Sequence, residues 1–342
     1  MRGGIGFASS SWRIASVARN PISRRQFSCT SPAQATYGFV GLGQMGYRMA
    51  KNLREKLPTD DVLIVQDINQ AASKKFAEEL TGFNVVVAES PRQVAENSET
   101  IITALPEPPH VKAVYDTMLQ PATLLKGGVP TPRLFIDCST IDLETSAAVA
   151  NAARSTQQGS FVDAPMSGGV MGAEAGTLTF MIGAPSELIE KASNVLSLMG
   201  RRILHMGDQG AGLKAKLANN YLLALNNIAT CEAMSMGIKW GLDPKALADM
   251  INISTGRCWP SEVNNPVPGV IPTSPSSKGY AGGFGVSLMN KDLKLALKAC
   301  EEFGVDVRIG PVAKQIYDAV QADENCKGKD FSVVYRYLGG KE

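Results

Sequence analysis

The chain has 342 residues and a formal net charge of +2, with 44% hydrophobic and 19% charged residues. This length is enough for two domains, and the composition is ordinary for a globular protein. The near-neutral charge gives no reason to expect a nucleic-acid partner, and no apolar run is long enough to cross a bilayer membrane.

Positive charge is concentrated at the start of the chain. Five arginines and several serines fall in the first 28 residues, and the first acidic residue is Glu55. Such a start, without a long apolar stretch, is typical of a mitochondrial transit peptide, although a disordered basic tail has a similar composition. We expect residues 1–34 to be this peptide and the mature protein to lie in the mitochondrial matrix. Because five positive charges would be removed, the formal charge of +2 would become −3.

From about residue 37 to residue 202, short apolar runs alternate with helical patterns. The runs are rich in Val, Ile and Phe, and several are continuous, which favours strands buried on both faces. This alternation predicts an α/β fold with a doubly wound parallel sheet, a Rossmann-type domain at residues 35–206. The predicted strands are 37–40, 62–66, 85–87, 101–104, 134–137, 161–163, 178–182 and 203–205, and the helices between them include 46–56 and 70–80.

After about residue 207 the pattern becomes helical. Residues 213–240 contain few helix breakers, and their apolar positions recur with the period of an amphipathic helix. Further helices are predicted at 244–253, 289–303 and 311–322, and together they make an all-helical C-terminal domain at residues 207–342. The proline-rich segment 258–284 is a long loop, which is either functional or a rigid surface excursion.

The cysteines and histidines give no sign of a metal site. The six cysteines are scattered without a Cys-x-x-Cys pair, and there are only two histidines. This spacing predicts neither a zinc site nor a disulfide framework, and it fits a reducing compartment. Catalysis by histidine or by a metal ion is therefore not expected.

A glycine-rich segment joins the first predicted strand to the first predicted helix. It reads Gly41-Leu42-Gly43-Gln44-Met45-Gly46, which has the Gly-x-Gly-x-x-Gly spacing of a dinucleotide-binding turn. Gly41 would permit the tight turn, Gly43 would let the backbone approach the pyrophosphate, and Gly46 would let the helix pack closely on the strand. The N-terminus of the helix would then face the phosphates. A glycine turn needed only for packing is the alternative.

Asp67 ends the second predicted strand at the separation expected of the carboxylate that binds the adenosine ribose. Such a carboxylate accepts hydrogen bonds from the ribose hydroxyls and repels a 2′-phosphate, so the predicted cofactor is NAD rather than NADP. Leu105, Pro106 and Thr140 follow two later strands of the same sheet. Because ligands bind beyond the carboxyl ends of such strands, these residues are candidates for contacts to the nicotinamide half.

Ser167, Gly168 and Gly169 also follow a predicted strand. The serine offers a hydroxyl, and the two glycine N–H groups can point at one acceptor, which makes an anion nest suited to a small carboxylate. From this segment alone, a plain Ser-Gly-Gly turn is the simpler explanation.

One face of the long predicted helix combines a lysine with two amides. Lys216, Asn219 and Asn220 are spaced i, i+3 and i+4, whereas Lys214 lies on another side and is expected to be solvated. With no suitable histidine, a lysine whose pKa is tuned by burial is the natural proton donor to a carbonyl oxygen. A surface lysine that buries only its stem is the alternative. Lys291, at the start of a later helix, is either a helix-start charge or a group that reaches across the domain cleft towards the cofactor.

Together these segments resemble the β-hydroxyacid dehydrogenase superfamily from residue 37 to about residue 338. The resemblance rests on the glycine turn with Met-Ala-Lys-Asn-Leu at 49–53, on Asp-Ala-Pro-Met-Ser-Gly-Gly at 163–169, on Gly-Ala-Gly at 210–212 with Lys-Leu-Ala-Asn-Asn at 216–220, and on Lys-Asp-Leu at 291–293. Met166 stands where valine is usual. Within the superfamily, Ser-Thr-Gly-Arg-Cys-Trp at 254–259 and Asn-Pro-Val-Pro-Gly-Val at 265–270 resemble the enzymes that act on 3-hydroxyisobutyrate rather than the glyoxylate and tartronate semialdehyde reductases.

The resemblance assigns a role to each candidate residue. Lys216 would be the general acid/base, Asn220 would orient the substrate, and Ser167 with Gly168 and Gly169 would hold the substrate carboxylate. The residues that would hold NAD are Gly41, Leu42, Gly43, Gln44, Met45, Gly46, Asp67, Leu105, Pro106, Thr140 and Lys291.

The activity that the resemblance implies is NAD-dependent oxidation of a small 3-hydroxy acid, 3-hydroxyisobutyrate, to methylmalonate semialdehyde in valine catabolism. It also implies a homo-oligomer, either a dimer or a tetramer. Two alternatives stay open at this stage. One is a semialdehyde reductase that works in the opposite direction with NADPH, and the other is a protein that only binds dinucleotide.

Overall fold

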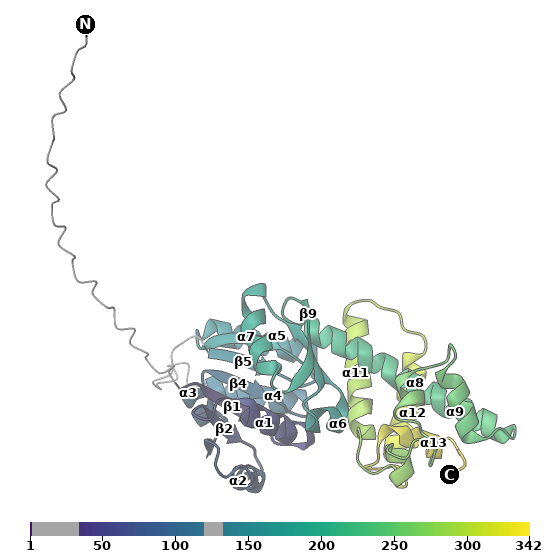
Figure 1. Ribbon diagram of the computed structural model, residues 1–342. Helices are drawn as coiled ribbons and strands as arrows, with labels where there is room; N and C mark the ends of the chain where they lie inside the picture. The colour runs from purple at the N-terminus through teal and green to yellow at the C-terminus, as the bar shows by residue number, and fades with distance from the viewer. Residues whose placement is uncertain (2–33, 120–132) are drawn as a thin grey trace. The chain divides into compact units, whose positions relative to one another are not determined.

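The computed structural model describes residues 34–119 and 133–342, together with Met1. The predicted transit peptide at residues 1–34 lies outside the described residues apart from its two end residues, Met1 and Gln34. In the described part, strands and helices alternate as far as β9, and the chain is helical from α8 onward (Figure 1).

A single mixed sheet organises the N-terminal half. In the described residues its order is β3-β2-β1-β4-β5-β6-β8-β7, and β9 pairs with β8. The neighbours from β3 to β6 are all parallel, whereas β8 runs antiparallel to β6 and to β7. The strands are β1 (Thr36–Val40), β2 (Val62–Gln66), β3 (Val85–Val87), β4 (Thr100–Thr103), β5 (Arg133–Asp137), β6 (Gly159–Asp163), β7 (Met166–Ser167), β8 (Leu178–Gly183) and β9 (Gly200–Gly207).

The predicted doubly wound Rossmann-type sheet is confirmed, with a difference at its far end. The strands predicted at 178–182 and 203–205 are present as β8 and β9, but both run opposite to the first six. The only helix between β6 and β8 is α6 (Gly169–Glu174), which has 6 residues. A helix of that length rises only about 9 Å, too little to carry the chain back along a strand of about 16 Å for another parallel pairing.

Helices cover both faces of the sheet. One core includes residues of α1 (Gln44–Lys56), α2 (Gln70–Glu79), α6 and α7 (Ser186–Leu196), and the other includes residues of α3 (Pro91–Asn97), α4 (Pro108–Leu119) and α5 (Leu143–Ser155). Phe39 belongs to the first core and Val40 to the second, because successive side chains of a strand point to opposite faces.

The C-terminal half packs around one long helix, as the all-helical prediction required. The helix α8 (Ala211–Lys239) has 29 residues, and α11 (Val286–Glu302), α12 (Gly310–Ala322) and α13 (Val334–Tyr337) lie beside it (Figure 1). Their shared core includes Met234, Met289 and Tyr317. The remaining elements are α9 (Pro244–Asn252), α10 (Trp259–Glu262), η1 (Pro275–Lys278) and η2 (Phe331–Val333).

The proline-rich segment 258–284 is not a bare loop, since it contains α10 and η1. The Ser276 hydroxyl donates a hydrogen bond to the Asn265 carbonyl (2.6 Å), and the Tyr280 hydroxyl donates one to the Pro266 carbonyl (2.9 Å). These internal hydrogen bonds favour a rigid surface excursion over a functional loop for this segment.

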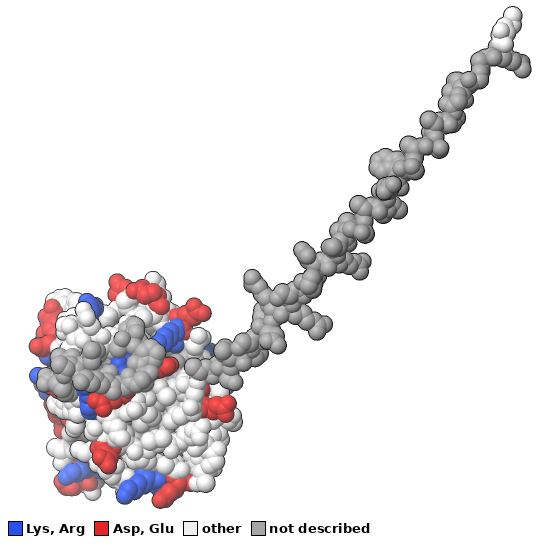
Figure 2. Space-filling view, turned by 90° about the vertical axis from the view of Figure 1, so that its left-hand side faces the viewer, with Lys and Arg blue, Asp and Glu red and all other residues white. Residues whose placement is uncertain are grey.

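None of the described helices is long and apolar enough to span a membrane. On the face presented in Figure 2, acidic and basic side chains are interspersed over a largely uncharged surface. This face therefore lacks the continuous positive patch that attracts polyanions such as nucleic acids.

The topology gathers five strand ends at one edge of the sheet. Strands β1, β2, β4, β5 and β6 are parallel, so the turns that follow them lie along the same edge. Helix α8 begins there, because the carboxylate of Asp163 at the end of β6 accepts hydrogen bonds from the backbone N–H groups of Gly210 (2.6 Å) and Leu213 (2.9 Å). This edge is therefore where the predicted site residues of both halves can meet.

Candidate active site

The glycine turn has the backbone geometry that its spacing predicts. Gly41 has a φ of +98°, and a Cβ there would lie 2.4 Å from the carbonyl oxygen of Ala104. A Cβ at Gly46 would lie 1.9 Å from the carbonyl oxygen of Gly41, so only glycine lets α1 start so close to the turn. Gly43 is exposed, and a Cβ there would meet nothing within 4 Å. The backbone at Gly43 is thus open to a ligand, as a pyrophosphate-binding position requires.

Gln44 and Met45 occupy the first turn of α1 and differ in their surroundings. Gln44 is exposed, and its backbone and side-chain oxygens both accept from the Arg48 guanidinium (2.7 and 3.2 Å). Met45 is half-buried and packs against the sheet core. Their backbone N–H groups belong to the helix N-terminus, where no intrahelical acceptor is available. Contacts from these two residues to a phosphate would therefore come from the backbone.

Asp67 lies against the glycine turn. One carboxylate oxygen accepts from the backbone N–H of Leu42 (2.6 Å), and the other accepts from the backbone N–H of Asn69 (2.7 Å). These two bonds hold the negative charge beside the turn, at the position from which it would meet an adenosine ribose and repel a 2′-phosphate.

The turn after β4 adjoins both the glycine turn and the turn after β5. A Cβ at Gly41 would lie 3.1 Å from Leu105 Cδ2, and the Leu105 backbone N–H donates to the Ser139 hydroxyl (2.9 Å). That hydroxyl donates in turn to the buried Asp137 carboxylate (2.6 Å). The turns that carry Leu105 and Thr140 are thereby fixed side by side.

Lys291 ties the helical half to this edge of the sheet. Its Nζ donates to the carbonyl oxygens of Pro106 (2.9 Å) and Thr140 (2.6 Å), and it forms an ion pair with Asp292 Oδ1 (3.0 Å). Two of the three ammonium donors are therefore taken by carbonyl oxygens, and the Asp292 carboxylate lies beside the charge as an ion-pair partner. In this structure Lys291 therefore holds α11 against the turns after β4 and β5, and its contact with the cofactor stays a prediction.

Lys216 is buried, with 8% of its surface exposed. Burial lowers its pKa from 10.5 to about 8, the nearby Lys291 charge acts in the same direction, and the Asp292 carboxylate opposes both. The alternative of a surface lysine is therefore wrong. Lys214 is exposed, as predicted, and its ammonium lies 5.0 Å from the centre of the Phe303 ring.

Asn220 lies one turn after Lys216 on α8, and it is fully buried. Its side-chain amide donates to Asp292 Oδ2 (2.6 Å), while its own oxygen accepts from the Asn219 amide (3.1 Å). Asn219 is exposed, so only one of the two predicted amides lies inside the protein. Asp292 accepts from Asn220, pairs with Lys291 and raises the pKa of Lys216 through its charge, although the sequence analysis assigned it no role of its own.

The Ser167–Gly169 segment forms the end of β7 and the beginning of α6. Gly168 and Gly169 have φ values of +133° and +62°, and both are exposed. In the part of the chain that the structure describes, no hydrogen bond or ion pair joins this segment to Lys216. The two are connected through β8, because Ser167 pairs with Thr179 and the start of α8 packs on the Met181 carbonyl.

Asp163 is a further residue whose role the sequence did not reveal. It is fully buried, and its two bonds to the first turn of α8 fix the helix that carries Lys216. Burial raises the pKa of Asp163 to about 6, against the opposing effect of the bonds from Gly210 and Leu213. Asp163 and the start of α8 at Gly210 are 47 positions apart, so no local sequence pattern contains both.

No metal-binding arrangement occurs at residues 34–119 or 133–342, where no three His, Cys, Asp or Glu side chains are grouped so that they could hold an ion. The groups that can do chemistry at this edge are an amine of lowered pKa, a carboxylate, an amide and a series of exposed backbone N–H groups. This set can bind a small anion and move one proton, and it needs a bound dinucleotide for a redox step.

Comparison with known proteins gives two family matches that together cover most of the chain. Residues 36–207 match the NAD-binding domain of 6-phosphogluconate dehydrogenase, and residues 210–338 match the NAD-binding domain of NADP-dependent 3-hydroxyisobutyrate dehydrogenase.

Individual relatives agree with the second of these matches. A probable mitochondrial 3-hydroxyisobutyrate dehydrogenase of Dictyostelium discoideum is 42% identical over 90% of this chain and 92% of its own length, and the mitochondrial 3-hydroxyisobutyrate dehydrogenase of Rattus norvegicus is 41% identical over 100% and 99%. Among solved structures, the 3-hydroxyisobutyrate dehydrogenase of Mycobacterium tuberculosis with L-serine is 36% identical. It covers 89% of this chain and 99% of its own, with a TM-score of 0.79.

Proposed function

The chain belongs to the 3-hydroxyisobutyrate dehydrogenase family, within the β-hydroxyacid dehydrogenases, and from this premise we propose which residues bind the ligands and which one moves the proton. The activity is NAD-dependent oxidation of the CH–OH group of 3-hydroxyisobutyrate to methylmalonate semialdehyde, a step of valine catabolism. When bound, NAD supplies the hydride acceptor.

Lys216 is the general base of the oxidation. In its neutral form the Nζ accepts the proton of the substrate hydroxyl, and in the reverse direction the ammonium form returns a proton to the carbonyl oxygen. The observation that carries this assignment is the burial of the amine, which lowers its pKa to about 8. An amine with this pKa is present in both protonation states near neutral pH, as a residue that works in both directions needs.

The substrate carboxylate is held by Ser167 and by the backbone N–H groups of Gly168 and Gly169, and Asn220 orients the substrate. Support comes from the start of α6 at Gly169, where backbone N–H groups have no intrahelical acceptor. The Mycobacterium tuberculosis relative is described with L-serine. L-serine shares the hydroxymethyl, central carbon and carboxylate of 3-hydroxyisobutyrate, with an amino group in place of the methyl group, so a carboxylate and a 3-hydroxyl are common to both.

NAD is held by the glycine turn, Gly41 to Gly46, with Asp67 at its ribose and Leu105, Pro106, Thr140 and Lys291 towards the nicotinamide. The open backbone at Gly43 and the carboxylate held beside Leu42 fit this cofactor. The expected preference is for NAD over NADP, because a 2′-phosphate would meet the Asp67 charge.

The proposed domains are an NAD-binding domain at residues 35–206 and a helical domain at residues 207–342. Large apolar side chains of the helical part are exposed, with 56% for Leu222, 73% for Trp240 and 88% for Ile253. Exposed apolar groups of this size are typical of a subunit interface, so a homodimer or homotetramer is the expected state. Light scattering after size-exclusion chromatography tests it, and a monomer at micromolar concentration would contradict it.

The proposed location is the mitochondrial matrix. Several relatives are named as mitochondrial enzymes, and the first 34 residues have the composition of a transit peptide. An import assay with isolated mitochondria should show cleavage and protease protection of the full chain. A chain without residues 1–34 should stay outside.

The test of the function is turnover of purified chain with 3-hydroxyisobutyrate and either NAD or NADP. We expect activity with NAD, and a Lys216→Ala variant that has lost turnover but binds NADH as the wild type does. A higher kcat/KM with NADP would contradict the role of Asp67, and retained activity in Lys216→Ala would contradict the role of the lysine.

A further inference from the structure

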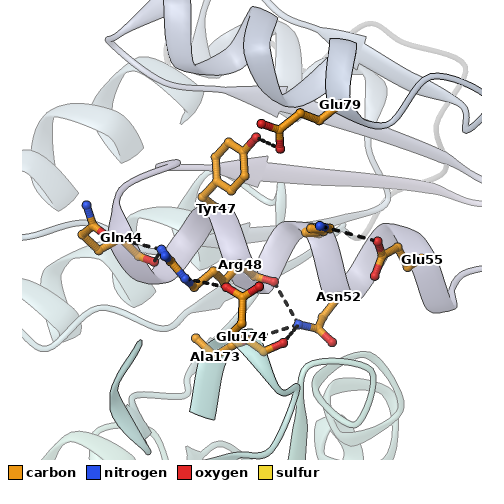
Figure 3. Close-up of polar contacts among 9 residues, drawn as sticks. Gln44, Tyr47, Arg48, Asn52, Glu55, Glu79, Ala173 and Glu174 are labelled. Atoms are coloured by element: carbon orange, nitrogen blue, oxygen red, sulfur yellow. Dashed lines mark hydrogen bonds and ion pairs between the residues drawn. The ribbon is translucent and has the colours of Figure 1, made fainter. Parts of the chain in front are cut away.

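Two helices start at the two predicted ligand-binding segments and meet along their sides. Helix α1 begins in the glycine turn at Gln44, and the short helix α6 begins at Gly169 in the Ser167–Gly169 segment. Figure 3 shows polar side chains of α1 pointing at the end of α6, where Ala173 and Glu174 lie. The helix that would face the pyrophosphate thus contacts the helix that would face the substrate carboxylate.

Asn52 makes the main polar contact between these helices. Its side-chain amide donates to the carbonyl oxygens of Ala173 (2.9 Å) and Glu174 (3.2 Å), and also to the Arg48 carbonyl on its own helix (3.1 Å). The last carbonyls of a helix lack the regular intrahelical donor. The Ala173 carbonyl accepts turn bonds from the backbone N–H groups of Ala175 and Gly176, and Asn52 adds a side-chain donor to it and to the Glu174 carbonyl. The chain continues close by, because a Cβ at Gly176 would lie 2.4 Å from the Asn52 amide oxygen.

Arg48 makes a second, weaker connection. Its guanidinium donates to the backbone oxygen of Gln44 (2.7 Å), and its Nε lies 2.7 Å from a carboxylate oxygen of Glu174 (Figure 3). The side chains of Arg48 and Glu174 are 29% and 64% exposed, and ion pairs at such positions contribute little on their own. The partly buried amide of Asn52 is therefore the contact whose loss should matter most.

These contacts all lie at the C-terminal end of α6, and Ala173 anchors the same end in the sheet core. Because α6 has only 6 residues, a rotation at that end is passed to Gly168 and Gly169 at the other. The direction of the two glycine N–H groups therefore depends on the contacts of α6 with α1 as well as on the pairing of Ser167 with Thr179.

We propose that Asn52 is a positioning residue for the substrate, which holds the end of α6 against α1 and so aims the Ser167–Gly169 segment relative to the dinucleotide-binding turn. This inference rests on the proposed carboxylate-binding role of that segment. Asn52 itself touches neither ligand in this account and acts only through α6.

The test replaces Asn52 by leucine, which has a similar size and no donor. The expected result is a KM for 3-hydroxyisobutyrate raised about tenfold, which corresponds to about 1.4 kcal/mol. The dissociation constant for NADH, measured by fluorescence, should change by less than about twofold, because the glycine turn keeps its own bonds. In the chain without ligands, backbone amides of residues 172–175, which follow the unbonded first turn of α6, should exchange hydrogen faster than in the wild type.

Two matched controls come from the same helix. Lys51 pairs with Glu55 within α1 (4.0 Å), so Lys51→Ala changes the charge of this surface without touching α6. Tyr47 bonds to Glu79 of α2 on the other side of the helix, so Tyr47→Phe removes a contact that leads away from α6 (Figure 3). Neither variant should change the KM for 3-hydroxyisobutyrate or the exchange of α6.

The outcomes separate positioning from a merely structural role. A lower kcat with an unchanged KM, a dissociation constant for NADH that rises as much as the KM, or unchanged exchange of α6 would each overturn the proposal. If Asn52→Leu does not fold, Asn52→Asp decides instead: the carboxylate has a similar size but cannot donate to the two carbonyls, so a KM raised about tenfold is expected and an unchanged KM would contradict the proposal.

Ser167→Ala distinguishes this inference from the proposed function. If Ser167→Ala leaves the KM for 3-hydroxyisobutyrate unchanged, the carboxylate-binding role of the segment itself fails. If Ser167→Ala raises the KM but Asn52→Leu does not, the segment keeps its role and only the positioning by Asn52 is refuted.

Discussion

The pH dependence of oxidation depends on one amine and the carboxylate beside it. Lys216 must be neutral to accept a proton, and burial brings its pKa from 10.5 to about 8. We expect kcat/KM for 3-hydroxyisobutyrate to rise about tenfold per pH unit below a midpoint of about 8 and to level off above it. In the direction of reduction the ammonium is needed, so the rate should fall through the same midpoint.

The size of the effect follows from the fraction of neutral amine. At pH 7 that fraction is about 0.03% for a pKa of 10.5 and about 9% for a pKa of 8, a gain of about 300-fold. The difference corresponds to about 3 kcal/mol in favour of the neutral form, supplied mainly by removal of the ammonium from water. An exposed lysine in the same place would therefore be a far weaker base at the pH of the cell.

The perturbation that tests this reasoning is Asp292→Asn. The carboxylate raises the pKa of Lys216, so its removal should move the midpoint below 8, while the asparagine oxygen still accepts from Asn220. The matched control is Asp318→Asn, because Asp318 pairs with Lys294 and Lys314 on the helical surface (2.7 Å each). The assay is the initial rate of NADH formation between pH 6 and 10. A midpoint that stays or rises in Asp292→Asn, or a shift of equal size in the control, would refute the assignment.

Further predictions concern Asp67 and the glycines of the cofactor turn, and the buried Asp163 at the end of β6. Asp67→Asn should lower the KM for NADP relative to NAD, since it removes the charge that repels a 2′-phosphate; an unchanged ratio would contradict this. Gly46→Ala should lower the melting temperature, because its Cβ would lie 1.9 Å from the Gly41 carbonyl, whereas Gly43→Ala should keep the melting temperature and weaken NADH binding. Thermal unfolding and NADH titration check these two variants. A lower melting temperature in Gly43→Ala, with that of Gly46→Ala unchanged, would contradict the prediction. The folded pKa of Asp163, about 6, lies above its ordinary 3.8, so its contribution to stability is full below pH 4 and is lost as the pH rises through 6, a change of about 3 kcal/mol. Urea unfolding should show a flatter pH dependence between 4 and 6 in Asp163→Asn, and equal slopes would contradict the assignment.

The parts of the fold that local sequence determines were predictable. The strands at 62–66 and 85–87 coincide with β2 and β3, because continuous Val and Ile runs flanked by turns specify parallel strands. Of the two, only β2 is buried, since β3 lies at the edge of the sheet. The glycine turn was predictable for the same reason, since the positive φ of Gly41 and the close approach at Gly46 are requirements within one short segment.

Other features depend on residues that are distant in sequence. The burial of Lys216 could not be read from α8 alone, because α11 supplies Asp292 and Lys291 at this side of the helix. Asn220 and Asp292 are 72 positions apart, and Asp163 and Gly210 are 47 apart. A periodic pattern reports which side of a helix is apolar, but it does not report which polar group of another element will face it. For that reason Asn219 and Asn220 looked equivalent in the sequence, although only Asn220 is buried.

The two-residue strand β7 and the direction of β8 were also beyond the sequence pattern. Two residues are too few to show an alternation of polar and apolar positions, and periodicity does not distinguish parallel from antiparallel pairing. Both features matter for the site, because β7 and α6 together place the Ser167–Gly169 segment.

The central claim is that Lys216 moves the proton, and chemical rescue of Lys216→Ala tests it most directly. The measurement is the rate of NAD-dependent oxidation of 3-hydroxyisobutyrate at pH 8, with and without a small primary amine such as ethylamine, alongside NADH titration. We expect a rate lower by about 10²- to 10⁴-fold, NADH binding like that of the wild type, and partial recovery in proportion to the neutral amine added. A variant that turns over at the wild-type rate, or that stays inactive at every amine concentration while binding both NADH and substrate normally, would contradict it.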